Sequence, residues 1–283
     1  MKTLTPSKIA LLLGIAVIFA ALSAALGYVL PPGVDWHLTF RPAARALISG
    51  QNPYQANLDA PFANAPCALL PLVPLALLPE PAGRGLLFMF GLLSFAVAAH
   101  RLKADRWALI AFLLSPVVFH TLLNANLDWL PVLGYTLHPV IGLFFVTVKP
   151  QMGSVVALFW LVEAWRQGGW RLTLKTFAPV TVVYLLSFAV YGLWPLNMLK
   201  AEHFTTWWNT SLWPMSIPVG LALAVAAIRK RDIRPAMAAS PALSPHVVFH
   251  SWVAALAAVV SSTPETIAAV IGLWILVFIR WFS

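Results

Sequence analysis

The sequence has little charge for its length. Of its 283 residues, 10% are Asp, Glu, Lys or Arg and 60% are hydrophobic, whereas about a quarter of the residues in a soluble globular chain are charged. This shortage argues against an ordinary soluble protein. No charged or Gly/Ser-rich stretch is long enough to be a linker, so residues 1–283 are predicted to form a single integral membrane domain. A bilayer core requires about 20 apolar residues per helix, which allows about seven to ten membrane segments.

Cysteine and the common catalytic motifs are also scarce. Cys67 stands alone, so the chain has neither an internal disulfide nor a cysteine pair with metal-ligand spacing. Walker-type, G-x-S-x-G and C-x-x-C motifs do not occur. The net charge is +9, but the basic residues form short clusters between apolar runs, which is typical of membrane topology signals. We therefore expect membrane lipids as partners and no nucleic acid.

The basic clusters predict the topology. Residues 9–30 form an apolar first helix, too long for the core of a signal peptide, and Lys2 and Lys8 precede it. The positive-inside rule then predicts a cytoplasmic N-terminus in a bacterial plasma (inner) membrane. It also predicts that the last span, residues 267–278, runs inward. The predicted cytoplasmic residues are Arg101, Lys103, Arg106, Arg166, Arg171, Lys175, Arg229, Lys230, Arg231 and Arg280.

Short and interrupted apolar runs complete the predicted fold. In the first external loop, residues 31–83, the pattern of residues 38–48 predicts an amphipathic helix at the membrane surface. Five prolines interrupt the apolar run that follows, and residues 129–165 are divided into runs too short to span; both patterns indicate broken or re-entrant helices. The predicted fold class is all-α, a polytopic transmembrane helical bundle with short or re-entrant helices.

Polar residues of the first external loop are the first candidates for a site. Asp35 lies just after helix one, where partial burial of a carboxylate raises its pKa toward that of a general base; a solvated helix-capping aspartate is the alternative. Arg41 and Arg45 share one helix face and offer several donors to a phosphate, or else anchor the helix to lipid head groups. Asn52 and Tyr54 belong to a turn and are candidate substrate-binding residues.

Further candidates lie later in the chain. Lys149 falls in an apolar run, where a lysine is costly unless it faces a polar cavity, and Gln151 follows it. Asn126 and Asp128 form a polar patch that could equally be a helix cap. His203 and Asn209 occupy a Trp-rich external loop, which suits sugar stacking or an interfacial belt. His246 and His250 are spaced to share a helix face, but without a third ligand no metal site is predicted; His246 is retained as a substrate-binding candidate.

In their order, four sequence features resemble glycosyltransferase family 87, a group of polytopic GT-C enzymes that use polyprenol-phosphate-mannose. The first is Asp35 followed by "RPAARALISGQNPY" and a proline-rich segment. The second is "SPVVFHTLLNANLDWL", and the third is "VKPQMG" with its intramembrane lysine. The fourth is the late pair "WWNTSLWP" and "SPHVVFHSW". The resemblance covers residues 9–252 and implies a GT-C-like fold.

The resemblance implies a reaction as well as a fold. Such an enzyme would transfer a mannose-like sugar from a polyprenyl-phosphate donor to an acceptor hydroxyl on the extracytoplasmic face. Asp35 matches the acidic residue presumed to be the catalytic base. Arg41, Arg45 and Lys149 would neutralise the leaving phosphate, so that neither a divalent metal nor another cofactor is required.

Two other functions remain open. The family's Gly-Gln is replaced by Asn124-Ala125, and the segment between Asp128 and Lys149 is short, which favours a non-catalytic subunit or scaffold with membrane protein partners. Broken helices and an intramembrane lysine also suit a small-molecule transporter, although the sequence shows no internal repeat.

Overall fold

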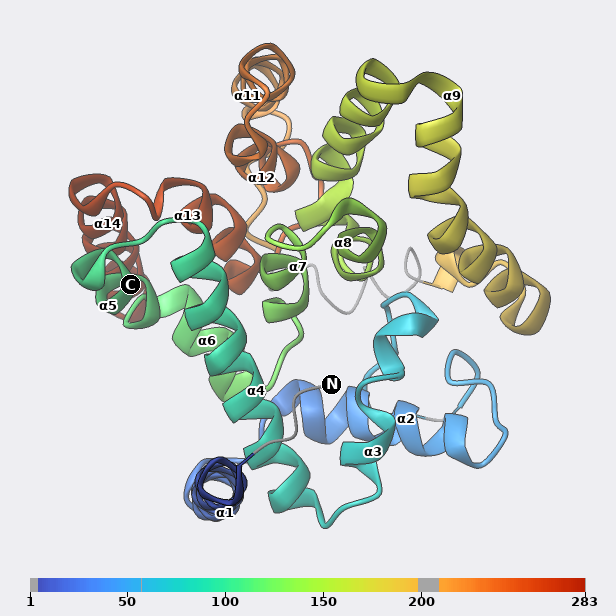
Figure 1. The fold of residues 1–283 in the computed structure, drawn as a ribbon, viewed down its shortest axis with the longest axis vertical. Coiled ribbons are helices and arrows are strands. Elements are labelled where there is room, and N and C mark those ends of the chain that lie inside the picture. The colour runs from blue at the N-terminus through green and yellow to red at the C-terminus, as the bar shows by residue number, and fades with distance from the viewer. Residues whose placement is uncertain (1–4, 57, 198–208, 283) are drawn as a thin grey trace.

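In the computed structural model of this protein, residues 5–56, 58–197 and 209–282 are described. In these ranges the fold is all-α, as predicted, and one isolated β-bridge joins Asn209 to Val248. Figure 1 shows the helices gathered around α7 and α8. In chain order the elements are α1 (Pro6–Val29), η1 (Trp36–Phe40), α2 (Arg41–Ile48), η2 (Pro66–Leu69), α3 (Val73–Ala76), α4 (Glu80–Arg101), α5 (Arg106–Leu113), α6 (Pro116–Asn124), α7 (Trp129–Gly134), α8 (Pro139–Val146), α9 (Pro150–Tyr191), α11 (Ile217–Lys230), α12 (Ile233–Ala242), η4 (Phe249–Trp252), α13 (Val253–Val259) and α14 (Thr263–Phe282).

The long apolar helices indicate an integral membrane protein. Four described helices are long and apolar enough to cross a bilayer, namely α1, α4, α9 and α14, and the pair α5 and α6, bent by 51°, is a possible fifth span. The other described helices are shorter. The total of seven to ten membrane segments therefore stays a prediction.

Close packing of α1 on α4 begins the bundle, along the lower part of α4 in Figure 1. Small residues make this approach possible. A Cβ atom added to Gly85 would lie 1.8 Å from the Ser23 carbonyl oxygen, and one added to Gly27 would lie 1.9 Å from that of Pro81. Two membrane helices that meet through glycine in this way gain backbone contacts that larger side chains would prevent.

Short helices form the segment between α1 and α4, as the sequence predicts. Trp36 and Phe40 of η1 are buried, and α2 buries three alanines while Arg45 remains exposed. The proline-rich run folds into η2 and α3, which end where prolines remove backbone donors. A short helix with an exposed arginine and a broken apolar segment are thus both confirmed, while the position of that helix at the membrane surface stays a prediction.

A glycine pair divides α9 into two arms. Gly168 and Gly169 have non-helical backbone angles, so residues 150–167 and 170–191 are separate helices that meet in a tight turn. Figure 1 shows the two arms diverging from this turn at the top of the view. The basic stretch that the sequence places in a cytoplasmic loop is therefore mostly helical, because only these two glycines leave the helical conformation.

The direction of the last span differs from the prediction. Thr263 at the start of α14 donates to the Asp105 carboxylate that caps α5, and Trp274 donates to the Leu114 carbonyl at the end of α5. These contacts make α14 parallel to α5, whereas the predicted topology makes the two antiparallel. Arg280 consequently lies toward the end of the bundle opposite Asp105.

The error arises at α12. Its sequence, IRPAMAASPA, combines small residues with two prolines and lacks a strong apolar run, so the sequence reading passes over it. Ser216 before α11 donates to the Ala242 carbonyl at the end of α12, so α12 returns antiparallel along α11. An additional helix at this point reverses the direction of every later element.

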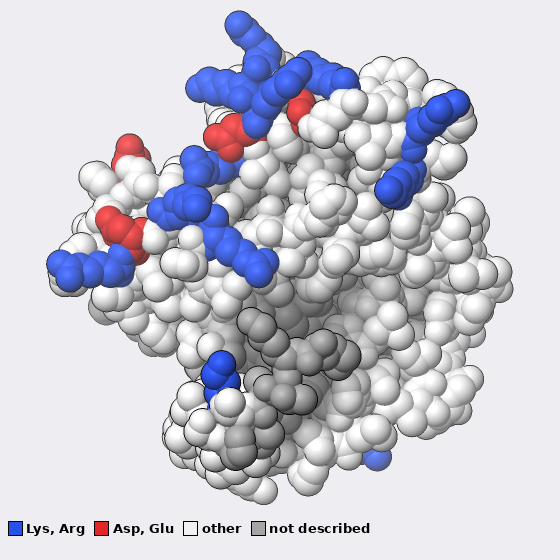
Figure 2. All heavy atoms as spheres, in the orientation of Figure 1, with Lys and Arg blue, Asp and Glu red and all other residues white. Residues whose placement is uncertain are grey.

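Basic side chains gather on one face of the molecule. Figure 2 shows Lys and Arg concentrated toward the top and upper left of the view, where the visible Asp and Glu side chains also lie. Exposed basic residues flank the break in α9 and end α11. Arg166 donates to the Ile228 carbonyl at 2.7 Å, which brings these two regions together. This grouping brings together two of the predicted basic clusters, those around the break in α9 and at the end of α11, whereas Arg280 belongs to the other end of the bundle.

Candidate functional site

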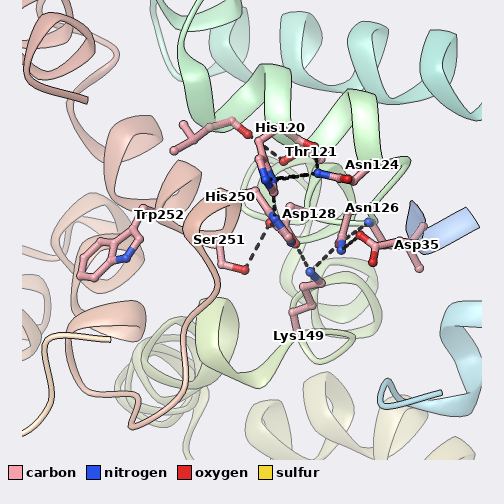
Figure 3. A network of polar contacts seen from close by, with 12 residues as sticks. Asp35, His120, Thr121, Asn124, Asn126, Asp128, Lys149, His250, Ser251 and Trp252 are labelled. Atoms are coloured by element: carbon pink, nitrogen blue, oxygen red, sulfur yellow. Dashed lines mark hydrogen bonds and ion pairs between the residues drawn. The ribbon is translucent and has the colours of Figure 1, made fainter. Parts of the chain in front are cut away.

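Polar side chains from distant parts of the sequence meet in one network, shown in Figure 3. Helix α6 and the turn after it supply several members, η4 supplies two, and single residues come from the segment after α1 and from the start of α9. The residues joined by hydrogen bonds and ion pairs are Asp35, His120, Asn124, Asn126, Asp128, Lys149, His250 and Ser251.

The turn after α6 aims Asn126 at Asp35. Ala125 has a left-handed backbone with φ of 55°, which ends α6, and the Asn126 amide then donates to the Thr121 carbonyl at 2.9 Å. The Asn126 side-chain oxygen accepts a hydrogen bond from the Leu127 amide at 2.6 Å. Both backbone contacts fix the side chain within the turn, so its nitrogen is free to face the segment after α1.

Asp35 is a half-buried carboxylate held by this amide. Asn126 Nδ2 donates to Asp35 Oδ2 at 2.6 Å. Burial raises the pKa of Asp35 above its ordinary value of 3.8, while the hydrogen bond from Asn126 and the positive charge of Lys149 act in the opposite direction. A carboxyl group with a raised pKa is a better proton acceptor than a solvated aspartate, which is the property required of a general base.

Lys149 and Asp128 form a buried ion pair. Their side chains are 5% and 0% exposed, and Lys149 Nζ also donates to the Asn126 side-chain oxygen at 2.5 Å. The lysine precedes α9, where an apolar run would otherwise leave its charge unpaired. Asn126 therefore lies between the candidate base and the ion pair, and contacts both.

Two histidines extend the network on the far side of Asp128. Ser251 Oγ donates to Asp128 Oδ2 at 3.2 Å, and His250 Nε2 lies 3.6 Å from the same oxygen. The His250 and His120 rings are stacked, with their Nδ1 atoms 3.0 Å apart. Sequence reading missed His120, although a histidine within an otherwise apolar span is itself a signal of a polar interior.

The predicted pairing of His246 with His250 on one helix face is wrong. His246 lies in an irregular segment before η4, so the two residues are not one helical turn apart. Pro245 precedes His246, and the His246 carbonyl accepts a hydrogen bond from the Ser244 hydroxyl. His250 instead faces His120.

The two loop arginines lie outside the network. Arg41 Nη1 is 3.4 Å from a Glu80 carboxylate oxygen, and Arg41 Nη2 donates to the Leu78 carbonyl. Glu80 also pairs with His37. Arg45 is exposed. Lys149, in contrast, is enclosed by Asp128 and Asn126. The three residues predicted to contact the phosphate, Arg41, Arg45 and Lys149, therefore do not come together in the described structure.

Other predicted binding residues have structural contacts. Asn52 accepts a hydrogen bond from the Tyr54 amide within the turn, and the Tyr54 hydroxyl donates to the Asn64 carbonyl at 2.6 Å. The Asn209 side chain bonds to the segment before η4. Gln151 is half-buried in the first turn of α9, and His203 lies outside the described residues.

The fold and site together define an all-α integral membrane protein with a polar network centred on a buried Asp-Lys pair. In the part of the chain that the structure describes, no group of three or more His, Cys, Asp or Glu side chains is arranged to hold a metal ion. No protein family model, curated protein or solved structure matches the chain.

Proposed function

We propose that this protein is a membrane glycosyltransferase that uses a polyprenyl-phosphate sugar, with Asp35 as the catalytic base. One observation carries the proposal: Asp35, Asn126, Asp128 and Lys149, singled out in three separate sequence motifs, are linked by direct contacts. The raised pKa of the Asp35 carboxyl is a second support, because it follows from burial rather than from exposure at a loop surface.

In the proposed reaction, the acceptor hydroxyl attacks the anomeric carbon of the sugar. A new carbon–oxygen bond forms as the bond from that carbon to the donor phosphate breaks, and the polyprenyl phosphate leaves with the bonding electrons. Asp35 takes the hydroxyl proton, which requires its carboxylate to lie within about 3 Å of the acceptor oxygen. The configuration at the anomeric carbon is inverted by this single displacement.

Asn126 and Lys149 have supporting roles in this proposal. The Asn126 amide orients the Asp35 carboxylate, and it is itself oriented by Lys149 and the Leu127 amide. Asp128 neutralises Lys149. The positive charge of the lysine therefore stabilises the network, and it contributes less to binding a phosphate further away. These residues would therefore keep Asp35 deprotonated and in one rotamer between turnovers.

A matched pair of variants tests the proposal. Asp35→Asn should abolish sugar transfer from a radiolabelled polyprenyl-phosphate hexose to membrane acceptors, with normal expression and thermal stability. Asp59→Asn makes the same chemical change at an exposed position of the same loop, and it should transfer at the native rate. Equal transfer by native protein and Asp35→Asn would rule out the proposed base.

A transporter is the second candidate, and the buried chain from Lys149 through Asp128 to His250 and His120 favours it. Chains of ionisable groups at membrane depth are typical of proton relays. In liposomes that contain the purified protein, an imposed pH gradient should then drive protons into the lumen. His250→Phe should stop this proton flux. A protein that transfers sugar but leaves the gradient intact would exclude this alternative.

A further inference from the structure

Arg84 is a buried cation whose charge is almost uncompensated by neighbouring groups. It lies in the second turn of α4, is 2% exposed, and is among the largest fully buried side chains. Its Nη2 donates to the Leu123 carbonyl at 2.7 Å, but Nε and Nη1 have no hydrogen-bond partner. None of the described carboxylates forms an ion pair with Arg84.

The partners that Arg84 does have are weak substitutes for an anion. Leu123 is near the end of α6, where the helix dipole contributes partial negative charge. The Phe88 ring centre lies 5.8 Å from the guanidinium carbon. Desolvation of a charge is unfavourable unless neighbouring groups compensate for it, and neither contact provides an acceptor for Nε or Nη1. An anionic ligand would provide an acceptor, because an oxyanion can accept from Nη2 together with either Nε or Nη1.

The location of Arg84 connects it to the candidate site. A Cβ atom at Gly33 would lie 2.8 Å from Arg84 Nε and 2.9 Å from the Asn124 carbonyl carbon. Two residues further along each of these segments, Asn126 donates to Asp35. Residues 33–35 and 124–126 therefore lie side by side, with Arg84 at one end of the pair and the candidate base at the other.

We propose that Arg84 binds the phosphate group of a lipid at this position. A guanidinium presents parallel donors that match two oxygens of a phosphate. Arg84 lies near the end of α4 that packs against the end of α1, and both helices are long enough to span a bilayer, so these ends are expected near the level of lipid phosphates. Arg41, in contrast, already has Glu80 as its counter-ion. This inference rests on the proposed function for the identity of the lipid, since it assigns the contact to the donor's phosphate.

A measurement of lipid binding, made without sugar transfer, tests the role of Arg84 in binding phosphate. The full chain is purified in maltoside detergent, which carries no phosphate. It is titrated separately with a polyprenyl monophosphate, phosphatidylglycerol, inorganic phosphate and the uncharged polyprenol. Native mass spectrometry then counts the bound ligand. The native protein should bind the polyprenyl monophosphate, and Arg84→Gln should lose about tenfold or more in affinity. Arg166→Gln also removes an arginine that donates to a helix-end carbonyl, and it should bind as the native protein does.

The ligand arms identify the source of the phosphate. Preference for polyprenyl monophosphate over phosphatidylglycerol supports a donor-lipid site, equal binding of both supports a general lipid-phosphate site, and binding of inorganic phosphate alone would overturn the lipid assignment. Undiminished binding by Arg84→Gln, or binding of polyprenol as tightly as its phosphate, would overturn the role of Arg84.

Two further variants separate folding and catalysis from binding. Arg84→Lys keeps the charge but not the paired donors, so it should fold even where Arg84→Gln does not and should bind more weakly than the native protein; native affinity would contradict the inference. Asp35→Asn should bind the polyprenyl monophosphate normally. If the native protein transfers no sugar but still binds the polyprenyl monophosphate through Arg84, the proposed enzyme activity is refuted and the phosphate site is retained.

Discussion

Asn126 donates a hydrogen bond from Nδ2 to Oδ2 of Asp35 at 2.6 Å, and this contact has a fixed direction. The Asn126 oxygen is occupied by Lys149 Nζ and the Leu127 amide, so an inverted amide would lose both donors. Asp35 consequently always receives a hydrogen bond and never gives one to this amide. The contact favours the ionised carboxylate and opposes the effect of burial.

The pH dependence of transfer should reveal this balance. Transfer requires ionised Asp35, so activity should rise with pH through a pKa above the ordinary 3.8. Asn126→Ala removes a contact that lowers this pKa, and it should move the acid limb of the kcat/KM profile to higher pH. Asn124→Ala, two residues away in the same turn, should leave the position of the limb unchanged. An unshifted limb in Asn126→Ala would show that another group titrates.

Breaking the buried ion pair should be costly. Asp128→Asn leaves the Lys149 charge buried without its counter-ion, and Lys149→Met does the same to Asp128; each should lower the free energy of unfolding by about 3–5 kcal/mol. The double variant should lose less than the sum, because no unpaired charge remains. Reversible unfolding in mixed micelles provides the measurement.

A surface pair provides the control for that measurement. Glu163 and Arg166 are 3.1 Å apart near the break in α9, with Arg166 substantially exposed. Glu163→Gln should cost less than about 1 kcal/mol, since exposed pairs are solvated and screened. Similar losses for the buried and exposed pairs would mean that Asp128 and Lys149 remain hydrated in the membrane.

Much of the fold follows from local sequence patterns. Apolar length and flanking charge predict α1 and α4, proline spacing predicts the broken segment before α4, and Arg41 and Arg45 mark a surface helix. The helix α12 has none of these signals, because its small residues pack against α11 without forming an apolar run. Packing between helices therefore decided the direction of α14, and no local pattern encodes it.

The site was predictable in its parts but not in its connections. A lysine in an apolar run signals a polar partner, and Asp128 meets that requirement. The sequence does not reveal that Asn126 joins this pair to Asp35, since the contact depends on the turn at Ala125. Arg84 went unnoticed because an arginine near a helix end usually reaches solvent, whereas this one is turned into the protein.

The interface between α1 and α4 should not tolerate an added methyl group. Gly85→Ala would place Cβ 1.8 Å from the Ser23 carbonyl oxygen, so the helices must separate. We expect a loss of about 1–3 kcal/mol in the free energy of unfolding, as for other overpacked positions. Gly14→Ala, in the same helix pair but with no neighbour within 4 Å, should be neutral or stabilising by up to about 1 kcal/mol. Thermal unfolding in detergent compares the two, and equal effects would contradict the close packing.

Gly33 should control the site through the spacing of two segments. A Cβ atom there would lie 2.7 Å from the Ala125 Cβ atom and 2.9 Å from the Asn124 carbonyl carbon, so Gly33→Ala must push residues 33–35 away from residues 124–126. The contact between Asn126 and Asp35 would lengthen, and transfer should fall about tenfold or more, because small displacements of a catalytic group are costly. Ala125→Gly removes one of the three atoms that the new Cβ would meet, the third being Arg84 Nε at 2.8 Å, and it also suits the left-handed backbone at position 125. The double variant should therefore regain part of the lost transfer rate, while Gly272→Ala, with open space around it, should have no effect. A double variant no better than Gly33→Ala would show that the spacing of these segments does not govern the rate.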